Sequence, residues 1–152
     1  MSGSSRPHPP PLFFLASLLV GWGLGFLHPL ASGLPTAARF GLGLLIQLLA
    51  LGLGGWGLRT FRRHGTTPDP NGTASALLTS GPFRLSRNPL YLALAATLAA
   101  FGLLLDSVWV LGMVPVLVLL LDRLVIAREE VRLRAQFGEA YVAYQLRVRR
   151  WL

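Results

Sequence analysis

Residues 90–121 read LYLALAATLAAFGLLL, then DS, then VWVLGMVPVLVLLL, so that only Asp106 and Ser107 separate two apolar runs. In lipid, every backbone polar group must be satisfied within the protein, and runs approaching ~20 apolar residues can cross the ~30 Å hydrocarbon layer as helices. A connection of two residues leaves room only for a tight turn. This stretch therefore predicts a helical hairpin in a membrane.

Two further apolar runs, Leu12–Leu27 and Phe40–Leu58, precede the hairpin. The chain has 152 residues, of which 53% are hydrophobic and 13% are charged. A soluble protein of this length needs more polar surface to cover its core. We predict an all-α integral membrane protein with about four transmembrane helices plus a C-terminal interfacial amphipathic helix, Tyr141–Leu152.

The glycines of the first run decide between two interpretations of it. The run could be the apolar part of a signal peptide, with Ala31-Ser32-Gly33 as a small-residue cleavage site. However, Gly21 and Gly25 have the spacing that allows close approach of two helix backbones. We therefore favour a packed helix.

The predicted organisation is a disordered Ser/Pro-rich tail followed by a single membrane domain. The tail covers residues 1–11 and the domain covers residues 12–152. Within the domain we expect the first two transmembrane helices in 12–58, a cytosolic loop in 59–88, the helical hairpin in 89–122 and cytosolic C-terminal helices in 123–152.

The distribution of basic residues predicts the orientation. The net charge is +8, the chain has no lysine, and the arginines gather in the loop after the second run and in the C-terminal tail. By the positive-inside rule, both termini and this loop are cytosolic. We expect a multi-pass protein of a prokaryotic inner membrane whose site faces the cytosol. Arginines beside apolar runs fit lipid headgroups. We therefore expect the bilayer as a partner, and we expect no binding of nucleic acid.

The composition also excludes several chemistries. The chain has no cysteine and no lysine, which excludes thiol nucleophiles and Schiff-base catalysis. The three histidines, at positions 8, 28 and 64, are too far apart in sequence to form a metal-binding motif, and no metal is expected.

Two motifs carry residues with chemical potential. The first, Gly81–Tyr91, reads GPFRLSRNPLY. Ser86 or Asn88 is expected to cap the third helix and Pro89 to occupy its first position, which places Arg87 beside the positive end of that helix.

The second motif is Glu129-Glu130, on a continuation of the fourth helix that is expected to stop at Gly138. Adjacent helical residues point ~100° apart, so one glutamate can face the bundle while the other faces water or an arginine. The hairpin turn returns both motifs to one membrane face, and we expect a pocket between them.

A less specific interpretation of these residues also exists. Arg87 could serve only as a determinant of topology, and Glu130 could form a weak surface pair with Arg134. Tyr141 and Tyr144 could be interfacial anchors.

The motifs, followed by Phe137-Gly138 and the pair Tyr141 and Tyr144, resemble a family of membrane methyltransferases. These are the enzymes of the isoprenylcysteine carboxyl methyltransferase and phospholipid N-methyltransferase type, and the resemblance covers about residues 79–151. It implies methyl transfer from S-adenosylmethionine to a hydrophobic or lipid-like acceptor. The cofactor-binding residues that it implies are Leu77, Leu78, Phe83, Arg87, Asn88, Pro89, Tyr91, Glu129 and Glu130.

Two departures from this family narrow the expected function. Asn88 stands where the prenylcysteine enzymes have histidine, and an amide cannot act as a general base. Val125 stands where those enzymes hold the substrate carboxylate with arginine. No catalytic residue is therefore assigned, and the acceptor stays open. Two alternatives remain: an NADPH-dependent membrane reductase of the sterol-reductase type, and a non-catalytic membrane protein with the same fold.

Overall fold

Helices make up most of the described chain, which comprises residues 9–67 and 75–152 of the computed structural model. Helix α1 spans Pro10–Leu27, α2 spans Thr36–Arg63, α3 spans Pro89–Leu104 and α4 spans Val108–Leu120. The described residues contain no strand. The predicted all-α fold is therefore confirmed.

Helix α4 continues without a break toward the C-terminus. A π-helical segment η2, Leu121–Ile126, leads directly into α5, Ala127–Phe137. Gly138 ends α5 with a positive φ of 53°, a conformation that costs glycine little. A short helix α6, Glu139–Arg147, follows, and a 3₁₀ turn η1, Gly81–Arg84, precedes α3. The continuation of the fourth helix and its stop at Gly138 are as the sequence predicts.

Among the described residues, three helical segments are long and apolar enough to cross a membrane: α1, α2 and the continuous helix Val108–Phe137. Helix α3 is also apolar but has 16 residues. At ~1.5 Å per residue it spans only about 24 Å, less than the hydrocarbon layer. The fold therefore supports three full-length spans, and a fourth crossing by α3 stays a prediction. Of the expected tail, residues 1–8 lie outside the described residues, and α1 begins at Pro10.

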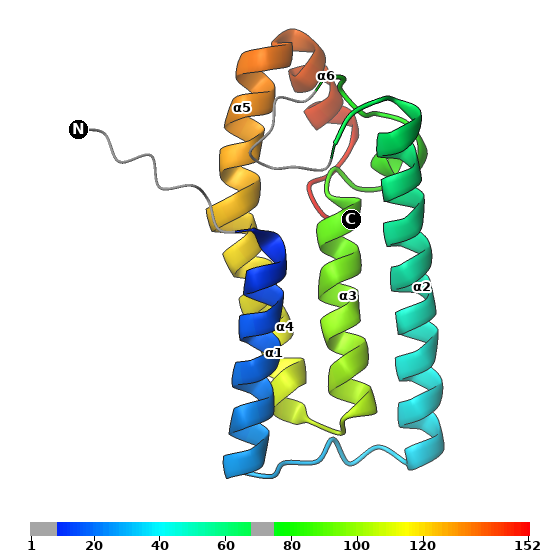
Figure 1. Cartoon of the computed structure of the whole chain (residues 1–152), viewed down its shortest axis with the longest axis vertical. Coiled ribbons are helices and arrows are strands. Elements are labelled where there is room, and N and C mark those ends of the chain that lie inside the picture. The colour runs from blue at the N-terminus through cyan, green and yellow to red at the C-terminus, as the bar shows by residue number, and fades with distance from the viewer. Residues whose placement is uncertain (1–8, 68–74) are drawn as a thin grey trace, which may run out of the picture.

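The helices lie side by side in the order α2, α3, α4, α1 (Figure 1). The α1–α2 connection passes the α3–α4 turn at one end of the bundle, which we call the turn end. The opposite end carries η1, α5 and α6, and we call it the motif end. Both sequence motifs lie there because the short turn between Leu104 and Val108 makes α3 and α4 antiparallel.

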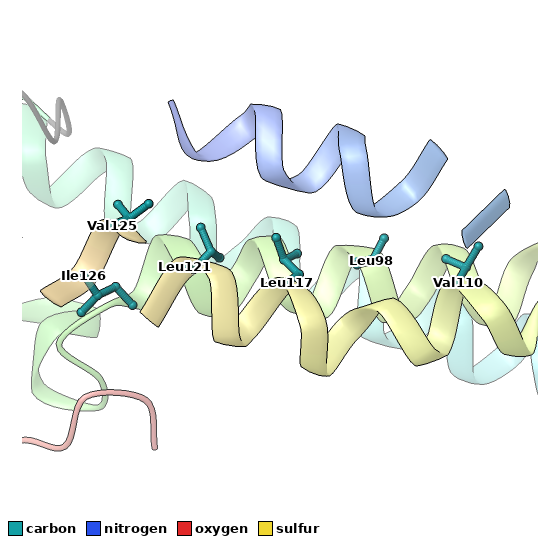
Figure 2. Close-up of a cluster of buried hydrophobic side chains, with 6 residues drawn as sticks. All are labelled: Leu98, Val110, Leu117, Leu121, Val125 and Ile126. Atoms are coloured by element: carbon teal, nitrogen blue, oxygen red, sulfur yellow. The ribbon is translucent and has the colours of Figure 1, made fainter. Parts of the chain in front are cut away.

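A buried apolar cluster holds α4 and η2 against α3. Leu98 comes from α3, and the other members lie along α4 and η2 (Figure 2): Val110, Leu117, Leu121, Val125 and Ile126. Outside this seam, the helices expose large apolar side chains, including Phe26 at 80% and Leu48 at 67%. A water-soluble protein rarely exposes so much apolar surface, so these faces are suited to lipid.

Asp106 ties the two connections together at the turn end. Its Oδ1 accepts hydrogen bonds from the backbone N–H of Ser32 at 3.0 Å and from the hydroxyl of Ser32 at 2.6 Å. These bonds lower the pKa of Asp106, and Arg39 adds a looser ion pair at 3.8 Å. The α1–α2 loop is thereby fixed to the hairpin turn.

Candidate functional site

The two sequence motifs meet in an ion pair at the motif end. Nη2 of Arg87 lies 2.9 Å from Oε1 of Glu130, and the two side chains are 11% and 12% exposed. Arg87 precedes α3 by two residues, and Glu130 lies in the first turn of α5. Burial makes such a pair costly to break, because the remaining charge would be left without a partner.

Glu129 points in a different direction from Glu130 and meets α3 instead. The hydroxyl of Tyr91 donates a hydrogen bond of 3.0 Å to Oε2 of Glu129. Glu129 makes no ion pair within 4.0 Å among the described residues. This arrangement agrees with the expected ~100° between neighbouring helical side chains.

The backbone of the segment after α6 lies against the first motif. The carbonyl of Arg149 accepts the N–H of Arg87 at 3.0 Å. The carbonyl of Arg150 accepts Oγ–H of Ser86 at 3.2 Å and Nδ2–H of Asn88 at 2.9 Å. Asn88 occupies the N-cap position of α3, but its side chain makes no cap hydrogen bond to the helix. Oγ of Ser86 instead accepts the N–H of Asn88 at 3.1 Å. Pro89 is the first residue of α3, as predicted.

The side chain of Arg150 binds two carboxylates on the long helix. Its Nη1 lies 3.1 Å from each carboxylate oxygen of Asp122. Its Nε and Nη2 donate to the two oxygens of Glu130, at 3.1 and 2.5 Å. Hydrogen bonding to Glu130 raises the pKa of Arg150 above its usual value. The surface pair between Glu130 and Arg134 is therefore a wrong interpretation, and Arg134 donates to Gln145 instead.

The three apolar members of the predicted site form a separate cluster next to the polar one. Leu78 and Phe83 are buried with Tyr141 and Tyr144, and Leu77 packs on them. The hydroxyl of Tyr144 donates to the carbonyl of Phe83 at 2.6 Å. The tyrosines are 2% and 3% exposed, so they are part of the core and not exposed interfacial anchors.

Tyr141 connects the apolar cluster to the charged one. Burial, followed by the negative charge of Glu130, raises the pKa of Tyr141 to about 12. Burial also raises the pKa of Tyr144. Both hydroxyls stay protonated near neutral pH, where they can only donate or accept hydrogen bonds.

In the described part of the chain, two cavities lie away from the charged cluster. A cavity of about 250 Å³ at the motif end is lined by Thr79, Arg84, Tyr144, Arg147 and Val148. A larger one of about 330 Å³ lies at the turn end against Asp106. Neither is lined by any of the nine residues predicted to bind the cofactor.

Comparison with known proteins places this chain in a family. The sequence model of the phospholipid methyltransferase family matches residues 38–140, which is more than half of the chain. The chain belongs to the phospholipid methyltransferase family. The predicted resemblance to membrane methyltransferases is thereby confirmed, and the chain is a membrane protein of that class.

A relative from Haemophilus influenzae is 41% identical over 64 residues, which are 41% of this chain and all of the relative. That relative is an uncharacterized protein, so it suggests no substrate. No solved structure matches the chain significantly.

Three residues of the polar cluster, Asp122, Arg150 and Trp151, are not among the nine residues that the sequence predicts to bind the cofactor. In the structure, Trp151 Nε1 donates to Oδ1 of Asp122 at 3.2 Å, beside Arg150. The local sequence carries no signal for these contacts, which join positions 28 and 29 residues apart.

Proposed function

We propose that this protein is an S-adenosylmethionine-dependent methyltransferase that acts on a hydrophobic or lipid-like acceptor. Membership of the family supports methyl transfer in general. The observation that carries the finer proposal is Glu129, a half-buried carboxylate whose hydrogen bond comes from the neutral hydroxyl of Tyr91.

The residues at this site fit the chemistry of the donor. S-adenosylmethionine carries a sulfonium and an ammonium, which a carboxylate and an aromatic face attract. Glu129 and Tyr91 supply these two groups. Its carboxylate needs a cation or N–H donors, and Nε of Arg87 is buried without a hydrogen-bond partner among the described residues. The start of α3, two residues away, adds a positive helix end.

The role we assign to these side chains is binding and orientation. When bound, S-adenosylmethionine would supply the methyl group, with the electron pair of the broken carbon–sulfur bond staying on sulfur. A lone pair of the acceptor would form the new bond to the methyl carbon, and an acceptor N–H or O–H would give its proton to water. Holding the two reactants in line and excluding other water accounts for catalysis without a general base.

The lipid-facing surface supports an apolar acceptor. Helices α1 and α2 expose large leucine side chains along their length. An acceptor with an apolar body can reach the bundle through the bilayer, whereas the water-soluble donor arrives at the motif end.

Calorimetric titration with S-adenosylhomocysteine, on protein in detergent or nanodiscs, tests the donor site. We expect the wild type to bind and Glu129→Gln to bind more weakly. The substitution keeps the size of the side chain but removes a charge-assisted contact worth about 1.5–3 kcal/mol, or roughly 10- to 100-fold in affinity.

The matched control is Arg134→Gln, a charge-removing change at an exposed position of the same helix, where Nη2 of Arg134 donates to Gln145 at 2.8 Å. We expect it to alter the affinity less than about 3-fold. Failure of the wild type to bind S-adenosylhomocysteine would exclude the methyltransferase proposal, and binding of NADP in its place would favour the reductase. Equal small losses in both variants would mean that Glu129 does not contact the ammonium group, the cation that S-adenosylhomocysteine shares with the donor.

A further inference from the structure

The ion pairs at the motif end are unevenly distributed among the acidic residues. Glu130 forms ion pairs with both Arg87 and Arg150, and Asp122 forms one with Arg150. Glu129 is left with the Tyr91 hydroxyl and with a longer-range electrostatic interaction with Arg132. Two arginines are therefore committed to Asp122 and Glu130, and Glu129 has no ion-pair partner within 4.0 Å among the described residues.

The π-helical segment makes this sharing possible. Asp122 and Glu130 are eight positions apart, and in a regular α-helix their side chains would point about 80° apart. Inside η2, the N–H of Ala127 bonds to the carbonyl of Asp122, an i→i−5 bond that makes one turn hold an additional residue. That residue takes up about 100° of rotation, which returns the two carboxylates to within about 20° of each other. One guanidinium can then bind both.

We propose that Arg150 is a positioning residue of the donor site. It clamps Asp122 and Glu130 to the segment after α6, while the carbonyls of Arg149 and Arg150 hold the backbone of Arg87 and the amide of Asn88. This clamp fixes α5 against the start of α3 and leaves Glu129 to the cationic part of the donor. The inference rests on the proposed function and assigns to Glu130 a structural task, distinct from that of Glu129.

The arginine side chain suits this task because its planar fork reaches two carboxylates at once. Different N–H groups of the guanidinium bind the two carboxylates: Nη1 donates to Asp122, and Nε and Nη2 donate to Glu130. A lysine in the same place would offer a single ammonium and could not hold both carboxylates in the same geometry.

The experiment is titration of S-adenosylhomocysteine into wild type, Arg150→Gln, Arg150→Lys and the control Arg147→Gln. Arg147 lies three residues earlier, and its Nε bonds only within its own helix, to the carbonyl of Ala143. We expect Arg150→Gln to weaken binding about 10-fold or more with the number of sites per protein unchanged. Arg150→Lys should recover only part of the loss, and Arg147→Gln should stay within about 2-fold of wild type.

The double variant Arg150→Gln/Glu130→Gln shows whether Arg150 acts through Glu130. We expect its loss of affinity to be clearly smaller than the product of the two single losses. A fall in the number of binding sites at unchanged affinity would instead mean partial unfolding, and would overturn the positioning role.

Two other results would also overturn it. Unchanged affinity in Arg150→Gln would show that the contacts of Arg150 with Asp122 and Glu130 do not affect binding of the donor. Tighter binding would mean that the guanidinium competes with the donor for the carboxylates. If the wild type itself does not bind, the proposed function falls together with this inference, whereas a binding wild type with an unaffected Arg150→Gln variant overturns the inference alone.

Discussion

Tyr141 shows how one buried residue at the motif end makes stability depend on pH. Its pKa rises to about 12 from an ordinary value of 10.0, first because of burial and then because of Glu130. A raised folded-state pKa means that the unfolded chain loses its proton first. The contribution of Tyr141 is therefore complete below pH 10 and is lost as the pH rises toward 12, by about 2–3 kcal/mol in total.

We accordingly predict that the stability of wild type and that of Tyr141→Phe depend differently on pH above pH 10. Thermal unfolding in detergent should show a shallower decline for the variant between pH 10 and 12, because it has no phenol to ionise at that site. Between pH 7 and 9 the separation of the two unfolding midpoints should stay constant. Parallel declines across the whole range would show that Tyr141 does not titrate with folding.

At the scale of elements, the contact of α1 with α4 depends on the absence of one side chain. A Cβ at Gly21 would lie 2.8 Å from Cα of Val110, which is backbone and cannot move aside as a flexible side chain could. The expected packing role holds at Gly21 and also at Gly25, where a Cβ would lie 3.1 Å from Oγ of Ser107. Gly23, between them, differs, because a Cβ there would meet nothing within 4 Å.

Gly21 and Gly23 provide a matched pair of substitutions on one helix. Gly21→Ala should destabilise the protein by about 1–3 kcal/mol through overpacking. Gly23→Ala should leave the stability within about 1 kcal/mol of wild type, since alanine adds helix propensity without a clash. Thermal unfolding in detergent checks both, and equal effects of the two changes would contradict the close α1–α4 contact.

The π-helical segment is the element that changes the arrangement of the site most. The absence of glycine and proline from Asp122–Phe137 indicates a continuous helix, which is correct. Regular α-helical geometry, however, would separate Asp122 from Glu130 around the axis. The insertion of one residue into a turn is decided by packing on both sides. In η2, Leu121, Val125 and Ile126 are all buried.

For the whole molecule, the distribution of arginine predicts which side of the membrane each end occupies. The absence of cysteine allows single cysteines to be placed without a background. Leu34→Cys, at the turn end, should react with a membrane-impermeant maleimide in intact cells. Leu152→Cys, at the motif end, should react only after the membrane is permeabilised. The opposite pattern would contradict a cytosolic donor site.

The sequence by itself determined the helical membrane class, the hairpin and the residues of both motifs. Each of these follows from local properties: the length of an apolar run, a two-residue turn, a proline at a helix start and a glycine at a helix end. Arg87, Tyr91 and the glutamate pair come together because an antiparallel hairpin returns its two ends to one face.

Only the tertiary structure decided which charged side chains form ion pairs with one another. The partners of Glu130 are residues 87 and 150, not the helical neighbour at 134. Asn88 donates to the carbonyl of Arg150 where a cap was expected. These contacts join distant parts of the chain, and they depend on the path of the segment after α6 and on the extra residue in η2. Both are set by packing among buried side chains, and a pattern along one segment cannot specify packing between segments.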